Sequence, residues 1–332
     1  MAKKFGSIRD VARATGLSTA TISRVMNGAR NVSPETRDRV LEACRRMDYV
    51  PNPAARALST NKSRTIAAII PNIDNSVFSK YIAGIEEALD KRNYSLVLAV
   101  CHGDPEQEFL AARKLLGMGA EAFILSGAVH LQELTQTLTR RQVPYVFTSI
   151  WDAESPTPTI GYDNFGIARN SVRYLADRGH RRLGVIHGPL AESDRTAARR
   201  AGALSAADDS LSLDCVETDL SVEGGKRAMV DILSRDPGVT AVLCMSDVLA
   251  LGVYFGLFEA GLRVPDDVSV MGFDNLDWAK DAAPPLTTND LPAGSMGREV
   301  ANQFVDHLED GAALESRLLP SRIVERASVR AL

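Results

Sequence analysis

Polar residues that could hold a small ligand follow the apolar segments in the second part of this sequence. Directly after four of these segments come an amide, two arginines, a hydroxyl group and two carboxylates: Asn72, Arg195, Arg199, Ser246, Asp247 and Asp274. Carboxylates and a forked guanidinium make paired hydrogen bonds to neighbouring hydroxyl groups. These residue types predict a site for a polyhydroxylated ligand. The alternative is that each residue only caps a helix, above all Ser246 and Asp247.

No sequence motif of a catalytic centre is present. We find no GxSxG, HExxH or P-loop pattern, and no GxGxxG after a predicted strand. The five histidines are dispersed, and the four cysteines lack CxxC or zinc-type spacing. The sequence therefore predicts a protein that is not an enzyme, holds no metal and no cofactor, and keeps its thiols reduced. A redox sensor at Cys44 or Cys101 is an alternative.

Charge is distributed unevenly along the chain. Residues 1–64 carry thirteen basic and five acidic side chains, a net charge of +8, whereas residues 65–332 carry −12. A cationic head on an anionic body is typical of a protein whose head binds a polyanion. No apolar run approaches the ~20 residues of a membrane span, and the first residues lack a secretory apolar region. We expect a cytoplasmic, nucleoid-associated protein with no membrane partner.

The head, residues 1–50, shows the pattern of a helix-turn-helix. Ser7 is a candidate cap for a first helix that ends at Gly16, and Ser18 is a candidate cap for a second helix. A third helix is predicted from Ser33 and Pro34. The residues expected to face the core of the head are Ile22, Val25 and Met26 in the second helix and Val40, Leu41 and Cys44 in the third.

The second of these helices would enter the major groove of DNA, with its early residues at the base edges. Arg24 could donate to guanine or to a phosphate. A helical hairpin that contacts nothing is the alternative.

Residues 51–64 are predicted to form a hinge. Asn52 and Pro53 begin a two-turn helix that is too short to be stable alone. Leu58 could wedge into a minor-groove step, while an ordinary linker is the alternative.

The body, residues 65–332, alternates short apolar segments with amphipathic ones, which predicts doubly wound parallel sheets. Expected strands are 66–70, 95–100, 122–125, 145–147, 183–186, 241–245, 269–272 and 322–324, and expected helices include 77–91, 106–116, 166–176, 224–233 and 247–260. The body is too long for one such sheet. We expect an N-lobe of about 65–160 plus 290–320 and a C-lobe of about 161–289 plus 321–332, with a ligand cleft at the facing strand ends.

Long stretches resemble the lactose-repressor (LacI/GalR) family of bacterial regulators. In the head and hinge these are IRDVARATGLSTATISRVMNG and VSPETRDRVLEACRRMDYVPNPAARAL, and in the body YLADRGHRRLGVIHGPL, SDVLALGVYFGLFEAGLRVPDDVSVMGFDN and PPLTT. The family shares the fold of periplasmic sugar-binding proteins in its body. The resemblance implies DNA contacts from the head and hinge at Ser7, Ser18, Thr19, Ala20, Thr21, Ser23, Arg24, Asn27, Ala55, Arg56 and Leu58.

The same resemblance implies which residues of the body contact an effector. They are Asn72, Val77, Phe78, Ser149, Arg199, Leu220, Ser246, Asp247 and Asp274. Arg199 and Asp274 match the pair that anchors the effector. Two positions depart from the family pattern, because Leu220 stands where some members place an aromatic residue over the ligand and Ser149 stands where a carboxylate is frequent.

Residues and resemblance together predict a sequence-specific DNA-binding transcriptional regulator, a repressor. It would bind a pseudo-palindromic double-stranded operator as a homodimer under allosteric control by a small polar effector, with a sugar or sugar derivative favoured. A purine-type effector is the alternative within the family, and a plain solute-binding protein is the alternative outside it. No heptad pattern follows residues 322–324, which favours a dimer over a tetramer.

Overall fold

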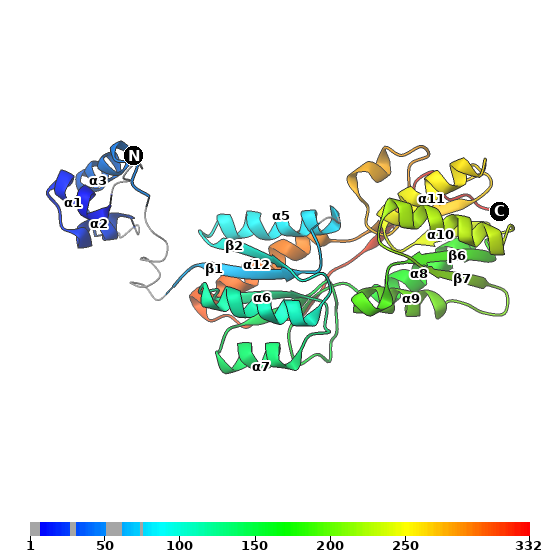
Figure 1. The fold of residues 1–332 in the computed structure, drawn as a ribbon, viewed down its shortest axis with the longest axis horizontal. Helices are drawn as coiled ribbons and strands as arrows, with labels where there is room; N and C mark the ends of the chain where they lie inside the picture. Colours follow the sequence, from blue (N-terminus) through cyan, green and yellow to red (C-terminus); the bar gives the residue numbers. More distant parts are fainter. Residues whose placement is uncertain (1–6, 27–30, 51–61, 74–75) are drawn as a thin grey trace. The chain divides into compact units, whose positions relative to one another are not determined.

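The computed structural model describes residues 7–26, 31–50, 62–73 and 76–332. The chain forms two compact units, Met1–Arg64 and Thr65–Leu332 (Figure 1). The described part of the first unit contains three helices, and the second unit contains parallel sheets covered by helices.

The three helices of the head are α1 (Ile8–Thr15), α2 (Thr19–Met26) and α3 (Pro34–Arg46). The predicted caps are confirmed. Ser7 Oγ accepts a hydrogen bond from the backbone N–H of Asp10 at 3.3 Å, and Ser33 Oγ accepts one from Thr36 at 3.2 Å. Gly16 ends α1 with a φ of 66°, a left-handed conformation that favours glycine.

A small apolar core holds the head together. Its buried residues are Val11, Ile22, Val25, Val40, Ala43 and Cys44. The expectation that Leu41 packs inward is wrong, because its side chain is 37% exposed. Positions 40, 43 and 44 have the i, i+3, i+4 spacing of one helix face, and Leu41 lies about 100° around the helix from Val40.

The N-lobe of the body is built on a six-stranded parallel sheet in the order β11-β5-β4-β3-β1-β2. Its strands are β1 (Thr65–Ile70), β2 (Ser95–Val100), β3 (Ala122–Ser126), β4 (Tyr145–Thr148), β5 (Thr159–Gly161) and β11 (Arg317–Leu318). Its helices are α5 (Ser76–Asp90), α6 (Pro105–Gly117), α7 (Gln132–Arg140) and α12 (Ala293–Asp310).

Side chains of β1 alternate between two cores. Ile66, Ala68 and Ile70 belong to the core that includes α5 and α12, whereas Ala67 and Ile69 belong to the core that includes α6 and α7. Figure 1 shows α5 on one side of the sheet and α6 and α7 on the other. Because both faces are covered, the central strands are apolar throughout, as parallel sheets require.

The C-lobe is built on a four-stranded parallel sheet in the order β7-β6-β8-β9. Its strands are β6 (Arg182–His187), β7 (Ser212–Glu217), β8 (Ala241–Cys244) and β9 (Ser269–Met271). Its helices are α8 (Asn164–Asp177), α9 (Asp194–Leu204), α10 (Val222–Arg235), α11 (Asp247–Glu259) and the 3-10 turns η1 (Leu190–Glu192) and η2 (Asp277–Lys280). The sheet is again buried on both faces, by α8 and α9 on one side and by α10 and α11 on the other.

The chain passes between the two lobes three times. It enters the C-lobe after β5, returns after β10 (Thr288–Asp290), and leaves the N-lobe again before β12 (Arg322–Val324). β10 and β12 form an antiparallel pair, while α12 packs on α5 and β11 pairs with β5. The predicted fold class, a helical head with two doubly wound parallel-sheet lobes, is confirmed.

α5 and α12 approach closely at glycines. A Cβ at Gly84 would overlap the backbone oxygen of Gly294, and a Cβ at Gly297 would overlap the backbone oxygen of Tyr81. These glycines therefore set the separation of the two helices. The position of α5 also shapes the pocket described below, since Phe78 and Tyr81 of this helix line it.

We predict that Gly297→Ala lowers the free energy of unfolding of the body by about 1–3 kcal/mol, because the added methyl group must push α5 away from α12. Gly294→Ala is the matched control on the same helix, since its Cβ would have its nearest neighbours at 3.6 Å. Urea unfolding followed by the fluorescence of Trp151 and Trp278 measures both variants. Equal stability of the two variants would contradict this account of the contact.

Candidate functional site

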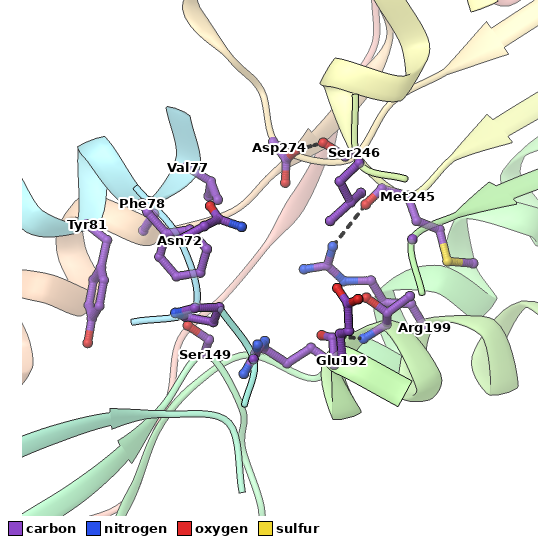
Figure 2. A pocket seen from close by; sticks show the side chains of 18 of the residues that line it. Asn72, Val77, Phe78, Tyr81, Ser149, Glu192, Arg199, Met245, Ser246 and Asp274 are labelled. Carbon is purple, nitrogen blue, oxygen red and sulfur yellow. Dashed lines mark hydrogen bonds between the residues drawn. The ribbon is translucent and has the colours of Figure 1, made fainter. Parts of the chain in front are cut away.

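A cavity of about 360 Å³ lies between the lobes, at the carboxyl ends of the strands of both sheets (Figure 2). We call it the interlobe pocket. Eight of the nine residues predicted to contact an effector line it: Asn72, Val77, Phe78, Ser149, Arg199, Leu220, Ser246 and Asp274. The ninth, Asp247, does not. Open α/β sheets place ligands at this end of their strands, because the loops there leave a crevice.

Arg199 reaches the pocket from α9 and is fixed by neutral partners. Its Nε donates to Oδ1 of Asn164 at 2.9 Å and its Nη1 donates to the backbone oxygen of Met245 at 3.0 Å. The guanidinium carbon stands 4.3 Å from the ring centre of Phe273. Burial lowers the pKa of Arg199. This side chain presents the remaining donors of a rigid fork to the cavity.

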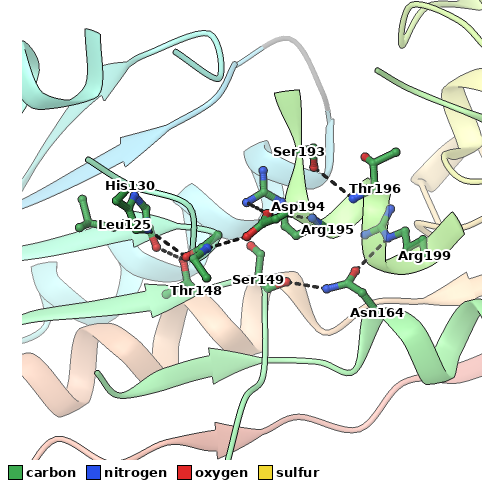
Figure 3. A network of polar contacts seen from close by, with 12 residues as sticks. Leu125, His130, Thr148, Ser149, Asn164, Ser193, Asp194, Arg195, Thr196 and Arg199 are labelled. Carbon is green, nitrogen blue, oxygen red and sulfur yellow. Dashed lines mark hydrogen bonds and ion pairs between the residues drawn. The ribbon is translucent and has the colours of Figure 1, made fainter. Parts of the chain in front are cut away.

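Asn164 connects Arg199 with the N-lobe (Figure 3). Its Nδ2 donates to the backbone oxygen of Ser149 at 2.9 Å, while its Oδ1 accepts from Arg199. Ser149 has a φ of 66° at the end of β4, a conformation that a non-glycine residue adopts only where its surroundings enforce it. The chain Ser149–Asn164–Arg199 therefore couples a wall of the N-lobe to the arginine of the C-lobe.

Asp274 faces the pocket from the loop after β9. Both of its hydrogen bonds use Oδ2, which accepts from the Ser246 hydroxyl at 2.8 Å and from the backbone N–H of Asp247 at 3.1 Å. Burial, reinforced by the nearby negative charge of Asp247, raises the pKa of Asp274 to about 7. The carboxyl group can accordingly accept or donate a hydrogen bond near neutral pH.

Asp247 holds the loop that carries Asp274. Its Oδ1 accepts from the backbone N–H of Phe273 at 2.8 Å and from the hydroxyl of Thr288 at 2.6 Å, and its Oδ2 accepts from the N–H of Leu276 at 2.7 Å. A Cβ at Gly272 would overlap Oδ1, so glycine is needed there. The structure thus places Asp247 behind the pocket, where it positions Asp274 instead of touching the cavity.

Several residues that line the pocket were not among the effector contacts implied by the resemblance. They are Pro71, Tyr81, His102, Gly103, Tyr162, Gly188, Pro189, Glu192, Ser193, Arg195, Thr196, Met245, Ala293 and Met296. Tyr162 follows β5, a three-residue strand that is too short to recognise by its pattern. Arg195 was a candidate from the sequence pattern, and it stands one helical turn before Arg199 on α9.

The head presents the polar side of α2. Thr19, Ala20 and Arg24 are exposed, while Thr21 and Ser23 are half-buried. Ser18 Oγ accepts from the backbone N–H of Thr21 at 3.1 Å, which confirms the predicted cap. Ser7 is exposed and caps α1. The predicted DNA contacts Asn27, Ala55, Arg56 and Leu58 lie outside the residues that the structure describes.

The described residues were also searched for a metal site, a membrane-spanning helix and a reactive cysteine. No group of three or more His, Cys, Asp or Glu side chains is placed to hold a metal ion there. None of the helices in that part of the chain is long and apolar enough to cross a membrane. Burial raises the pKa values of the Cys44 and Cys101 thiols, which disfavours the thiolate that a redox sensor requires.

The titration of Asp274 predicts how stability depends on pH. Its raised pKa means that the folded body binds a proton between about pH 4 and pH 7 that the unfolded chain does not, so this residue's contribution to stability falls as pH rises through that window. Asp274→Asn mimics the protonated carboxyl and removes this dependence. Relative to the variant, wild type should lose on the order of 1–2 kcal/mol between pH 5.5 and 7.5 in urea unfolding. Identical pH profiles would contradict the assignment.

Comparison with known proteins assigns the chain to a family. Residues 7–52 match the bacterial regulatory proteins of the lacI family, and residues 172–329 match a periplasmic binding protein-like domain. The transcriptional repressor CytR of Escherichia coli (strain K12) is 33% identical over 335 residues, covering 98% of this chain and 97% of CytR. The repressor PurR of Klebsiella pneumoniae (strain 342) is 33% identical over 339 residues, with 98% and 97% covered.

Solved structures agree with this assignment. A crystal structure of the lac repressor dimer bound to operator and the anti-inducer ONPF matches with a TM-score of 0.87 and 26% identity, over 99% of this chain and 100% of that one. A LacI family regulator from Silicibacter pomeroyi matches with the same TM-score and identity, over 98% and 99%. These relatives are transcriptional regulators and not enzymes, and the protein belongs to the LacI family of bacterial regulatory proteins.

Proposed function

We propose that the protein represses transcription by binding a pseudo-palindromic operator as a homodimer, and that a small polar effector in the interlobe pocket sets its affinity for operator. A sugar or sugar derivative is the favoured effector. The observation that carries the proposal is the combination of a helix-turn-helix head with a pocket in which Arg199 and Asp274 face one cavity from separate elements.

Support for operator binding comes from the geometry of the head. The early residues of α2 are exposed, and the apolar residues Ile22 and Val25 of the same helix are buried. A recognition helix needs this division, because its early polar residues must reach base edges while the head stays folded. The related lac repressor structure contains operator DNA.

Support for a sugar-like effector comes from the pocket walls. Asp274 and Arg199 offer acceptors and forked donors for hydroxyl groups, and Phe78 offers an aromatic wall. A related regulator structure, CelR, is a cellobiose complex with a TM-score of 0.69, and a LacI family regulator from Enterococcus faecium holds ribose, with a TM-score of 0.70. Tyr81 and Tyr162 also line the pocket, so a purine that stacks on an aromatic side chain is the second candidate.

Support for a homodimer comes from α11. Phe255 and Phe258 lie one helical turn apart on its surface, and their side chains are 48% and 80% exposed. Two neighbouring exposed aromatic side chains are typical of a covered surface. A second copy of the chain would cover this face by a two-fold axis and bring two heads to two half-sites of the operator.

Contacts that join the lobes on both sides of the pocket provide the means of control. Lys80 of α5 forms an ion pair with Asp277 at 2.9 Å and donates to the backbone oxygen of Asn275 at 3.0 Å. The carboxylate of Asp194 accepts from the backbone N–H of Ala128 at 2.6 Å. A ligand that changes the angle between the lobes must remake these contacts, which gives the two arrangements that allosteric control needs.

We predict that Arg24→Ala weakens operator binding by about 1–3 kcal/mol because it removes a contact from the recognition helix. Arg45→Ala on α3 is the control, since it removes the same charge from an exposed position of the head. Fluorescence anisotropy with an operator selected from random-sequence DNA, and with non-specific DNA, measures both variants. An equal loss in both variants, or an equal loss on both DNAs, would contradict a specific contact by Arg24.

A further inference from the structure

Two arginines of α9, Arg195 and Arg199, line the interlobe pocket one helical turn apart. The family resemblance implies Arg199 as an effector contact, whereas Arg195 was a candidate from its residue type and position alone. Burial lowers the pKa of Arg199, Tyr162 and the charge of Asp274 oppose this, and the nearby charge of Arg195 lowers that pKa further. The wall therefore presents two positive charges that repel each other across one helical turn.

Arg199 forms no ion pair within 4.0 Å in the described part of the chain. Its contacts are an amide oxygen, a backbone oxygen, the ring of Phe273 and the side chain of Tyr162, and the charge of Asp274 acts on it from a greater distance. A buried cation without an ion pair is costly, so a negative group that enters the cavity gains more than it would in water.

Arg195 has a counter-ion that is already engaged elsewhere. Its side chain is 11% exposed, and its Nη1 lies 3.3 Å from Oδ1 of Asp194. The same carboxylate accepts from the backbone N–H of Ala128 through Oδ2 at 2.6 Å and from that of Arg195 through Oδ1 at 2.8 Å. Asp194 is thus held by backbone donors (Figure 3), and the fork of Arg195 keeps donors for a ligand.

Asp274 is an acid of the pocket whose charge raises the pKa of Arg199, but it does so without forming an ion pair with it. Asp274 has both hydrogen bonds on one oxygen and lies beyond ion-pair distance of the arginines, and Glu192 forms no ion pair with either of them within the described residues. Ser149 lines the pocket and brings no charge to it. The pocket therefore has two guanidinium forks, one helical turn apart, on one wall.

We propose that the effector is an anionic sugar derivative whose carboxylate or phosphate group binds between Arg195 and Arg199, while its hydroxyl groups bind Asp274. Guanidinium forks recognise the planar carboxylate and the phosphate group by paired hydrogen bonds. Arg195 is then the residue that selects an acid over the neutral sugar of the same ring. This proposal rests on the proposed function of the pocket.

The test compares matched pairs of ligands on the full-length chain. The probes are D-glucose, D-glucuronate and D-glucose 6-phosphate, D-ribose and D-ribose 5-phosphate, and inorganic phosphate, all at constant ionic strength. Isothermal titration and the shift in unfolding temperature are the readouts. We expect an acid to bind at least about tenfold tighter than its neutral partner, and inorganic phosphate to stabilise wild type.

Arg195→Gln should remove the preference for the acid and the stabilisation by phosphate, and Arg195→Lys should restore part of both because it keeps the charge. Arg200→Gln on the same helix is the control, since Arg200 does not line the pocket, and it should behave like wild type. The proposal is overturned if no acid binds, if the neutral sugar binds as tightly, or if Arg195→Gln and Arg200→Gln respond alike.

The two proposals fail in different ways. A neutral sugar that binds the pocket and changes operator affinity would overturn the anionic effector and leave the regulated repressor intact. An acid that binds through Arg195 without any change in operator affinity would support the anionic site and contradict the regulated repressor.

Discussion

The buried carboxylate of Asp247 is the interaction on which the ligand pocket depends. It stands at the first turn of α11 and accepts from backbone N–H groups of the loop after β9 and from the hydroxyl of Thr288. An unpaired carboxylate would not be stable there, so the loop must wrap around it, and in doing so the loop turns Asp274 toward the cavity. The same loop reaches across to Lys80 of the N-lobe. One buried acid thus positions both the Asp274 carboxyl group at the cavity and the backbone oxygen that Lys80 binds across the lobes.

A second set of contacts crosses on the other side of the pocket. Ser149, at the end of a strand of the N-lobe, is bound through Asn164 to Arg199 of the C-lobe, and Asp194 accepts from Ala128. A ligand that takes hydrogen bonds from Arg199 must therefore affect groups in both lobes. Contacts between the two lobes therefore flank the pocket on both sides, and the proposed control by an effector would act through them.

Sequence patterns predicted the buried parts of this fold well, because strands covered on both faces read as unbroken apolar runs. They missed β7, whose edge position leaves its residues partly exposed, and β5, which has three residues. The helices named as examples from the pattern did not include α7, α9 or α12. Of the nine effector contacts that the family resemblance implied, eight line one cavity. The resemblance could not show that Ser246 lines the cavity and Asp247 does not. Sequence spacing shows which strand a residue follows, but it does not show which of two adjacent side chains faces the cavity.

The central claim is that the interlobe pocket controls operator binding without being part of the operator site. The most direct test measures operator affinity by fluorescence anisotropy, with and without a ligand that raises the unfolding temperature of wild type, for wild type and Asp274→Ala. The account predicts that both proteins bind operator equally well without ligand and that only wild type responds to it. A variant that loses operator binding together with the ligand response, or that still responds, would contradict the account.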